Sequence, residues 1–233
     1  MQYKNTVEGI FLARPNRFVA LVSLQGAQHV CHVKNTGRCR ELLLPGATVV
    51  LEKSENPARK TQYDLIAVYK GKRLINMDSQ APNHVAEEYL PSLFPGAILR
   101  REVPLGESRI DFSAETPQKR AFIEVKGVTL EENGVAYFPD APTLRGVKHI
   151  RELIRAVEAG HDAMLLFVVQ MENISCVRPN ERTHPAFAQA LREAAQQGVS
   201  IRAVACRVTP STLVAHQSIP VALWDDRVSR PAP

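Results

Sequence analysis

Short runs in which apolar and polar residues alternate fill the first 80 positions of the chain. A period of two is typical of strands that turn one face towards a core. Turn-forming pairs such as Pro15-Asn16, Gln25-Gly26 and Pro45-Gly46 separate the runs. A sheet of so many short antiparallel strands protects its edge strands most simply by closing into a barrel. We therefore expect a small β-barrel over residues 1–80. The six predicted strands cover residues 6–13, 18–24, 28–33, 48–53, 64–69 and 73–76.

Helical and strand patterns alternate in the rest of the chain. Polar and turn-forming residues suggest a linker over residues 77–83, and a helix over 84–90 is expected to stop at Pro91. The elements predicted after it are strands at 98–103, 109–113, 121–126, 163–169 and 200–207 and helices at 144–159 and 185–197. This alternation predicts an α/β domain with a mixed central sheet over residues 81–225, followed by a frayed tail at 226–233.

The composition is that of a globular protein, with 45% apolar and 23% charged residues among 233. The longest apolar run, at 163–169, is far shorter than the roughly 20 residues that span a bilayer. No apolar secretory segment is visible near the N-terminus, so we expect a cytoplasmic protein without a membrane partner. The cysteines suit reduced thiols, and no common zinc site has the spacing of His29, Cys31, His32 and Cys39.

Positive charge is concentrated in the first third of the chain. Residues 1–80 hold 12 Lys and Arg against 6 Asp and Glu, a net charge of +6, whereas residues 81–233 hold 17 against 18. A positive surface attracts polyanions, so nucleic acid is the leading partner. The alternative is a solvated basic surface that serves solubility.

The segment 33–40 is the most suggestive part of this basic region. Its Asn-Thr-Gly sequence is able to form a tight turn, and basic residues surround that turn. A small oligonucleotide-binding barrel uses such loops to contact phosphates. The alternative is a turn ahead of a short helix over 40–44. The candidate nucleic-acid-binding residues here are Lys34, Asn35, Arg38 and Arg40.

A predicted hairpin in the second domain brings acidic and basic residues together. Because side chains alternate along a strand, Asp111 shares a face with Arg109, and Glu124 shares a face with Lys126. An antiparallel register that pairs 111 with 124 places Arg109 opposite Lys126 and makes two carboxylates and one ammonium converge. Mg²⁺ binds one or two carboxylates, and a nearby lysine stabilises developing charge. The alternative is an ordinary hairpin whose exposed face carries an ion pair.

The helix predicted over 144–159 has two different sides. Apolar residues lie on one side, and Arg145, Lys148, His149 and Glu152 lie on the opposite side. Near a carboxylate hairpin, Arg145, Lys148 and His149 suit phosphate recognition, and Arg109 of the hairpin is a further candidate nucleic-acid-binding residue. The alternative is a solvated face held by pairing between successive turns.

At these residues the chain resembles the SfsA family, named for sugar fermentation stimulation protein A. The matching segments follow one another in the family's order over most of the chain, and their combination is highly specific. They are RFVA at 17–20, HVKNTG at 32–37, SRIDF at 108–112, FIEVKGVTL at 122–130, YFPDA at 137–141 and RGVKH at 145–149.

The resemblance implies an oligonucleotide-binding (OB) barrel followed by a domain similar to PD-(D/E)xK nucleases. It also implies DNA binding without sequence preference, with RNA as a further partner to consider. Asp111 and Glu124 would hold Mg²⁺ or Mn²⁺, and Lys126 would be the catalytic lysine. Glu88 would be an additional acidic ligand, with Glu87 as a weaker candidate. Ile110 stands where the motif has proline, which leaves the carboxylate geometry intact.

Two functions therefore follow from the sequence. The first is a DNA-binding regulatory protein of sugar (maltose) metabolism whose nuclease-like site does not cleave. The second is an active metal-dependent nuclease that hydrolyses DNA or RNA through Asp111, Glu124 and Lys126. A nuclease-like fold persists without cleavage in many proteins, so the fold by itself does not decide between them.

Overall fold

The computed structural model describes residues 1–35 and 37–224. Packing divides them into two compact units. The first unit consists of Met1–Tyr89, Val168–Asn173 and Ala205–Gln217. The second consists of Leu90–Phe167, Ile174–Val204 and the described residues from Ser218 onward. Segments that lie far apart in the sequence thus share a core.

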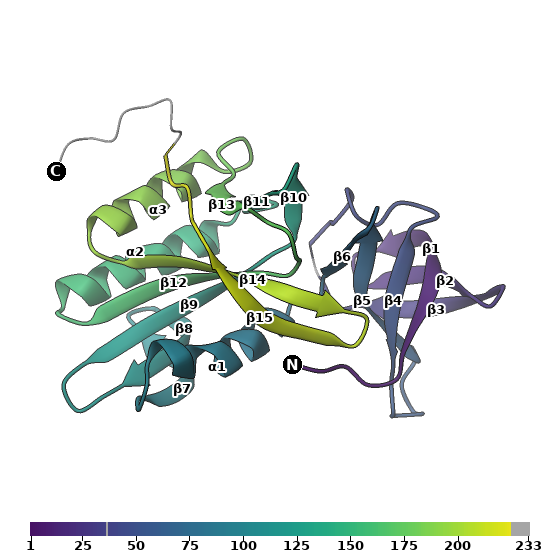
Figure 1. The fold of residues 1–233 in the computed structure, drawn as a ribbon, viewed down its shortest axis with the longest axis horizontal. Coiled ribbons are helices and arrows are strands. Elements are labelled where there is room, and N and C mark those ends of the chain that lie inside the picture. Colours follow the sequence, from purple (N-terminus) through teal and green to yellow (C-terminus); the bar gives the residue numbers. More distant parts are fainter. Residues whose placement is uncertain (36, 225–233) are drawn as a thin grey trace. The chain divides into compact units, whose positions relative to one another are not determined.

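Five strands close a barrel in the first unit (Figure 1). The strand order is β3-β2-β1-β4-β5, and a parallel pairing of β3 with β5 completes the ring. The predicted OB-like barrel is confirmed, and closure leaves its strands without free edges. Its strands are β1 (Thr6–Asn16), β2 (Val19–Leu24), β3 (Ala27–Val33), β4 (Thr48–Lys53) and β5 (Tyr63–Lys70), and β6 (Arg73–Asn76) continues the sheet beside β5.

A glycine allows β1 to cross β2 closely. A Cβ atom on Gly9 would lie 2.7 Å from Val22 Cγ1 and 2.7 Å from Leu24 Cδ2. Both contacts are shorter than side-chain packing tolerates, so any other residue would have to displace the buried side chains of Val22 and Leu24. The alternation of β2 puts Val22 and Leu24 into the barrel core, as its sequence pattern predicts.

A six-stranded sheet with the order β15-β14-β12-β9-β8-β7 forms the centre of the α/β part (Figure 1). Helix α2 (Leu144–Glu158) packs against β8 and β9, and α3 (Pro185–Gln196) packs against α2. The predicted α/β class is confirmed. The strands are β7 (Ile98–Leu105), β8 (Ser108–Glu115), β9 (Arg120–Val128), β12 (Asp162–Val169), β14 (Ser200–Thr209) and β15 (Thr212–Ile219). A smaller sheet contains β10 (Leu130–Glu132), β11 (Val135–Phe138) and β13 (Cys176–Pro179).

The segment predicted as a linker is packed. Met77, Asp78 and Ala81 are all buried, and helix α1 (Ala81–Leu93) begins within it. The prediction of a linker over 77–83 is therefore wrong. Its polar residues make internal hydrogen bonds, for example Ser79 with Lys34 O. Composition alone does not distinguish such residues from solvated ones.

Helix α1 also continues past the proline that was expected to end it. Pro91 lies inside the helix, and Phe94 N still donates to Leu90 O at 2.9 Å. Proline costs the helix one hydrogen bond here, and burial of Leu90 holds the preceding turn in place. The short helix considered over 40–44 does not form, because residues 40–42 make a turn and 43–44 are irregular.

Four strands escape the sequence pattern. β10, β11 and β13 are only three or four residues long, and β15 is exposed over most of its length. Such strands lack the alternation that marks a half-buried strand. The predicted tail at 226–233 lies outside the described residues, as does Thr36 of the predicted turn.

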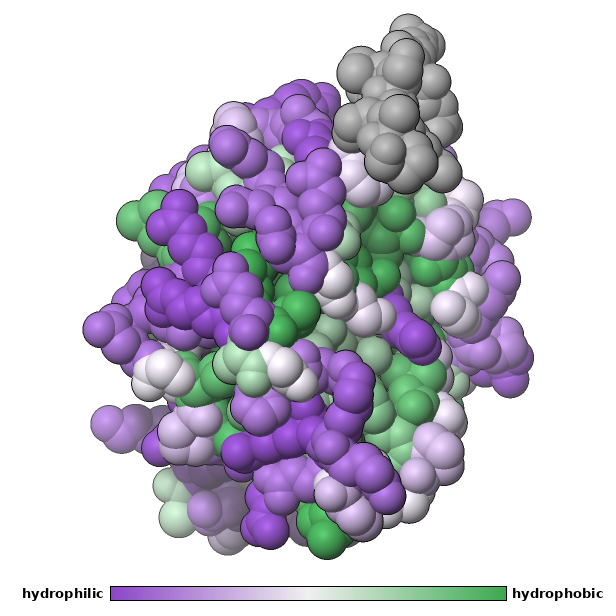
Figure 2. All heavy atoms as spheres, turned by 90° about the vertical axis from the view of Figure 1, so that its left-hand side faces the viewer, coloured by the Kyte–Doolittle hydropathy of each residue, from purple (hydrophilic) through white to green (hydrophobic). Residues whose placement is uncertain are grey.

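None of the described helices is long and apolar enough to cross a membrane. Hydrophilic side chains cover most of the face at the left of Figure 1, with smaller hydrophobic areas between them (Figure 2).

Candidate functional site

The hairpin of β8 and β9 has the register that the sequence predicts. The observed pairs run from Phe112 with Ile123 to Glu115 with Arg120. Continued by one residue, this register sets Asp111 beside Glu124. There the side chain of Asp111 replaces a backbone partner, because its Oδ2 accepts from Val125 N at 2.8 Å.

Glu124 is the centre of the site. Its carboxylate is 2% exposed, and Oε1 accepts from Lys126 Nζ at 2.6 Å and from His149 Nδ1. Its other oxygen, Oε2, is buried and has no hydrogen-bond partner among the described residues. A buried carboxylate oxygen without a donor is costly, so this atom is suited to receive a ligand with positive charge.

The Glu124 carboxyl keeps its negative charge despite its burial. Burial raises the pKa of Glu124, but the hydrogen bond from His149 and the Lys126 ammonium outweigh that effect, and the pKa lies below its usual value. At neutral pH the site therefore presents an ionised carboxylate.

Helix α2 positions His149 over the hairpin. The helix begins at Thr143, whose side-chain oxygen accepts from Gly146 N at 3.0 Å, an N-cap contact. His149 is 5% exposed, and its Nε2 contacts Arg145 Nε at 3.3 Å. The ring thus lies between Arg145 and Glu124, and its contacts are with protein groups.

The predicted division of α2 into two sides is wrong in part. His149 and Glu152 are buried together with the apolar side, whereas Arg145 and Lys148 are exposed. Their polar groups have partners inside the fold, namely Glu124 for His149 and Arg155 for Glu152. The exposed side of the helix carries four basic residues, Arg145, Lys148, Arg151 and Arg155.

The other predicted site residues of this region lie as follows. Arg109 is exposed on β8, and Glu87 is exposed on α1. Glu88, also on α1, accepts from the N-terminal ammonium at 2.7 Å. Among the described residues no group of three or more His, Cys, Asp or Glu side chains is arranged to hold a metal. Glu88 therefore does not join Asp111 and Glu124 in such a group, and the cysteines and histidines of β3 do not form one either.

In the barrel, the basic loop after β3 is held by an arginine that the sequence analysis missed. The guanidinium of Arg14 donates to the carbonyl oxygens of Arg17, Asn35 and Arg38. The Asn35 side chain donates to Met77 O at 2.8 Å and accepts from Gly37 N at 2.7 Å. A lone arginine at the end of a strand gives no local signal for such a role.

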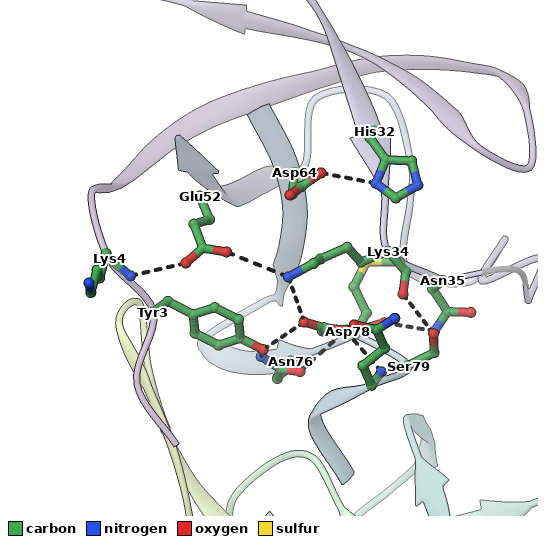
Figure 3. A network of polar contacts seen from close by, with 12 residues as sticks. Tyr3, Lys4, His32, Lys34, Asn35, Glu52, Asp64, Asn76, Asp78 and Ser79 are labelled. Carbon is green, nitrogen blue, oxygen red and sulfur yellow. Dashed lines mark hydrogen bonds and ion pairs between the residues drawn. The ribbon is translucent and has the colours of Figure 1, made fainter. Parts of the chain in front are cut away.

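Lys34 has acidic partners inside the first unit. Its Nζ lies 3.1 Å from Asp78 Oδ2 and 3.5 Å from Glu52 Oε2 (Figure 3). Burial lowers the pKa of Lys34, but the carboxylates of Asp78 and Glu52 raise it by more. The pKa therefore lies above its usual value, and the ammonium remains charged. Lys34 therefore belongs to an internal network, while Arg38 and Arg40 are exposed.

An exposed aromatic ring lies close to this loop. Phe18 is 45% exposed, and the guanidinium carbon of Arg17 lies 4.8 Å from its ring centre. Phe18 O also accepts from Val33 N at 2.8 Å, which ties the β1–β2 turn to the end of β3. We call Arg17, Phe18, Arg38 and Arg40 the loop surface. A ring beside several cations is the combination that binds single-stranded nucleic acid.

A second buried carboxylate pairs with cations on the barrel. Asp64 accepts from Arg59 at 2.7 and 2.8 Å and contacts His32 Nδ1 at 2.9 Å (Figure 3 shows the His32 contact). Burial raises the pKa of Asp64, but the hydrogen bonds from Arg59 and His32 outweigh this and lower it below its usual value.

We expect Asp64 to make the fold sensitive to acid. Because its pKa is lower in the folded state, its contribution is complete above the unfolded pKa of about 3.9 and is lost as pH falls through the folded pKa. Asp64→Asn should cost about 1–3 kcal/mol at pH 7 and flatten the fall of the thermal midpoint below about pH 4.

The control for this prediction is Glu55→Gln, which changes an exposed carboxylate 3.9 Å from Lys4. It should cost under about 1 kcal/mol and leave the pH profile as in the wild type. Parallel pH profiles for wild type and Asp64→Asn would contradict the prediction.

Comparisons with known proteins cover nearly the whole chain. The model of the SfsA N-terminal OB domain matches residues 12–77, and that of the sugar fermentation stimulation protein RE domain matches residues 80–212. A sugar fermentation stimulation protein homolog of Desulfitobacterium hafniense is 52% identical over 225 residues, which are 96% of this chain and 99% of that protein. One of Ruminiclostridium cellulolyticum is 50% identical over 226 residues, 96% of this chain and 100% of that protein.

One solved structure is similar over the same extent. It is SfsA of Pyrococcus furiosus in complex with Ca²⁺, which is 30% identical and superposes with a TM-score of 0.85. The similarity covers 95% of this chain and 98% of that one, so both units are included.

Proposed function

The chain belongs to the sugar fermentation stimulation protein family, and on that premise we propose that it binds DNA without sequence preference and holds a divalent cation at Asp111 and Glu124. The observation that carries the cation site is the buried Oε2 of Glu124, an ionised carboxylate oxygen without a hydrogen-bond donor. The Pyrococcus furiosus relative was solved in complex with Ca²⁺, which supports binding of a divalent cation by a chain of this family.

The residues present fit a hard cation. Mg²⁺ and Mn²⁺ prefer oxygen ligands, and Mg²⁺ usually takes one or two carboxylates and keeps several waters. Glu124 and Asp111 supply two carboxylates on adjacent strands, and one oxygen of Asp111 is fixed by Val125 N. The proposed site therefore needs no third protein ligand.

The neighbouring side chains keep this site ready for a phosphate. Lys126 and His149 hold one oxygen of Glu124, which leaves the other to face the cation. Lys126 is only partly buried, so its ammonium is also available to a phosphate oxygen. The exposed basic side of α2 would then guide a nucleic-acid backbone to the hairpin.

DNA binding is proposed for the loop surface of the barrel. Phosphate contacts by Arg38 and Arg40 would give affinity, and Phe18 would stack on a base whatever its identity. Following the names of its relatives, we also propose that this binding serves the regulation of sugar metabolism. The family resemblance adds maltose as the candidate sugar.

Arg38→Ala/Arg40→Ala is expected to weaken DNA binding and its dependence on salt. Each lost phosphate contact lowers the slope of log K against log salt by about 0.7–0.9, so the slope should fall by about 1.5–2. Fluorescence anisotropy with a labelled oligonucleotide at several salt concentrations measures it. The control, Lys53→Ala/Lys60→Ala, removes two exposed charges, one at the end of β4 and one from the β4–β5 connection. Equal slopes for the two variants would locate binding elsewhere, first of all on the basic side of α2.

An active nuclease is the second candidate function, and the contact between Lys126 Nζ and Glu124 Oε1 favours it. A bound Mg²⁺ or Mn²⁺ would polarise the phosphodiester and lower the pKa of a bound water. Lys126 would stabilise the charge that develops on the phosphate.

Incubation of the full chain with single-stranded, duplex and branched DNA and with RNA tests the nuclease. Metal-dependent products that disappear in Lys126→Ala, with DNA binding retained, would establish cleavage. Intact substrates under all these conditions would leave DNA binding with a non-cleaving site as the function.

A further inference from the structure

A cavity of about 320 Å³ opens in the second unit, apart from the residues of the hairpin site. Its wall comes from β11, from the end of β13 and the connection to α3, from α3 itself and from residues 222–224 (Figure 1 shows these elements). Its volume is that of a small-molecule site. The residues that matter for its chemistry are Tyr137, Arg178, Arg182, Arg192 and Trp224.

The charge of this cavity is positive. Three arginines line it, and Glu181 is the one acidic residue among its described lining residues. The carboxylate of Glu181 pairs with Arg192, and Arg192 Nε donates to Leu223 O at 2.7 Å. Arg182 pairs with Glu132 at 2.7 Å, at a position where both side chains are largely exposed. Guanidinium groups bind phosphate through paired hydrogen bonds, whereas such a cavity repels metal cations.

Flat aromatic groups lie in the same wall. The Arg182 guanidinium carbon lies 6.0 Å from the ring centre of Tyr137, and Trp224 is half-buried at the cavity. An aromatic ring beside an arginine offers a stacking surface next to a phosphate contact. Asn180 fixes this wall, since its backbone N donates to Phe138 O and its side chain donates to Pro139 O.

We propose that this cavity binds a nucleotide monophosphate group, with the phosphate at the arginines and the base against Tyr137 and Trp224. A free mononucleotide and the 5′-phosphorylated end of a strand share this chemistry. The proposal rests on neither the cation site nor the loop surface, because the cavity shares no residue with either of them.

Trp224 is the sole tryptophan of the chain, so its fluorescence reports on ligand binding in the cavity. We expect deoxyadenosine 5′-monophosphate, added to the full chain without divalent cations, to change tryptophan fluorescence in a saturable way. Calorimetry should give the same dissociation constant. Inorganic phosphate alone and deoxyadenosine alone should each bind at least tenfold more weakly, because each makes only half of the contacts.

Arg182→Ala should weaken binding of deoxyadenosine 5′-monophosphate about tenfold, the usual scale for one charge-assisted contact. Its side chain is 73% exposed, so the variant should fold. Arg202→Ala, which removes an exposed charge from β14 outside the cavity, is the matched control and should bind like the wild type.

A competition experiment then identifies the source of the nucleotide. Displacement of the mononucleotide by a 5′-phosphorylated oligonucleotide but not by its 5′-hydroxyl form would identify a strand end, and displacement by neither would identify a free nucleotide. Equal binding by the Arg182→Ala and Arg202→Ala variants, or calorimetry in which the mononucleotide binds no more tightly than phosphate, would overturn the proposal. These experiments involve neither Glu124 nor a divalent cation, so their failure would leave the proposed cation site untouched.

Discussion

Glu124→Gln is expected to remove the stabilisation that Mg²⁺ or Mn²⁺ gives to the wild-type chain. A ligand that binds only the folded state stabilises it by about 2.7 kcal/mol at 100 times its dissociation constant. Glutamine keeps the shape of the side chain and one oxygen, but it removes the negative charge that Glu124 carries on its unpartnered Oε2. The shift of the thermal midpoint on adding metal should therefore fall close to zero.

The variant is judged by the difference between its midpoints with and without metal, because the substitution also weakens contacts with Lys126 and His149. Asp162→Asn changes an exposed carboxylate paired with Lys119 and serves as the matched control, with a metal shift like that of the wild type.

Lys126→Ala separates binding of the cation from cleavage. It removes a cation beside Glu124 but no proposed ligand, so the metal shift should stay the same or grow while any cleavage is lost. A wild-type midpoint that metal does not move, with Glu124→Gln no different, would reduce the hairpin to a buried ion pair. DNA binding by the barrel would then remain as the proposed function.

Asp78→Ala is expected to destabilise the first unit by about 3 kcal/mol, because the Lys34 ammonium keeps only Glu52 and the buried donors around Asp78 lose their acceptor. Asp78 is 1% exposed, and its carboxylate accepts from Lys34 and from Tyr3 Oη at 3.3 Å (Figure 3). It also accepts from Gln80 N at 2.9 Å. The last contact satisfies a backbone donor at the start of α1. Urea unfolding followed by circular dichroism measures the loss.

Two further variants make this prediction specific. Glu52→Gln removes the other acidic partner of Lys34, which is more exposed, and should cost about 1 kcal/mol or less. Asp78→Asn keeps the hydrogen-bonding shape without the charge and should lie between the two. A cost for Asp78→Ala no larger than that for Glu52→Gln would show that the network does not hold the unit together.

The same network gives Lys34 surroundings that its neighbours in the sequence do not indicate. Lys34 stands beside Arg38 and Arg40 in a basic loop, so local charge groups the three together. Its carboxylate partners lie on β4 and at the start of α1. No local pattern reveals a partner that folding brings from so far along the chain.

His149 presents the same difficulty in the second unit. Helical periodicity puts it with Arg145 and Lys148, yet its partner Glu124 lies 25 residues earlier on β9. Burial of a histidine and a glutamate against a sheet is favourable only because each satisfies the other. Arg14 is a third example, since its contacts are three backbone oxygens in the loops around it.

The sequence by itself determined the strands of the barrel, the α/β class of the second part and the register that sets Asp111 beside Glu124. These features depend on side-chain periodicity and on turns, which are local properties of the chain. Tertiary structure alone decided which charged groups are paired inside the fold and which keep an atom without a donor. It showed Lys34 and His149 bound to buried carboxylates and Glu124 Oε2 left without a donor, because the partners of buried polar groups are chosen by packing between distant segments.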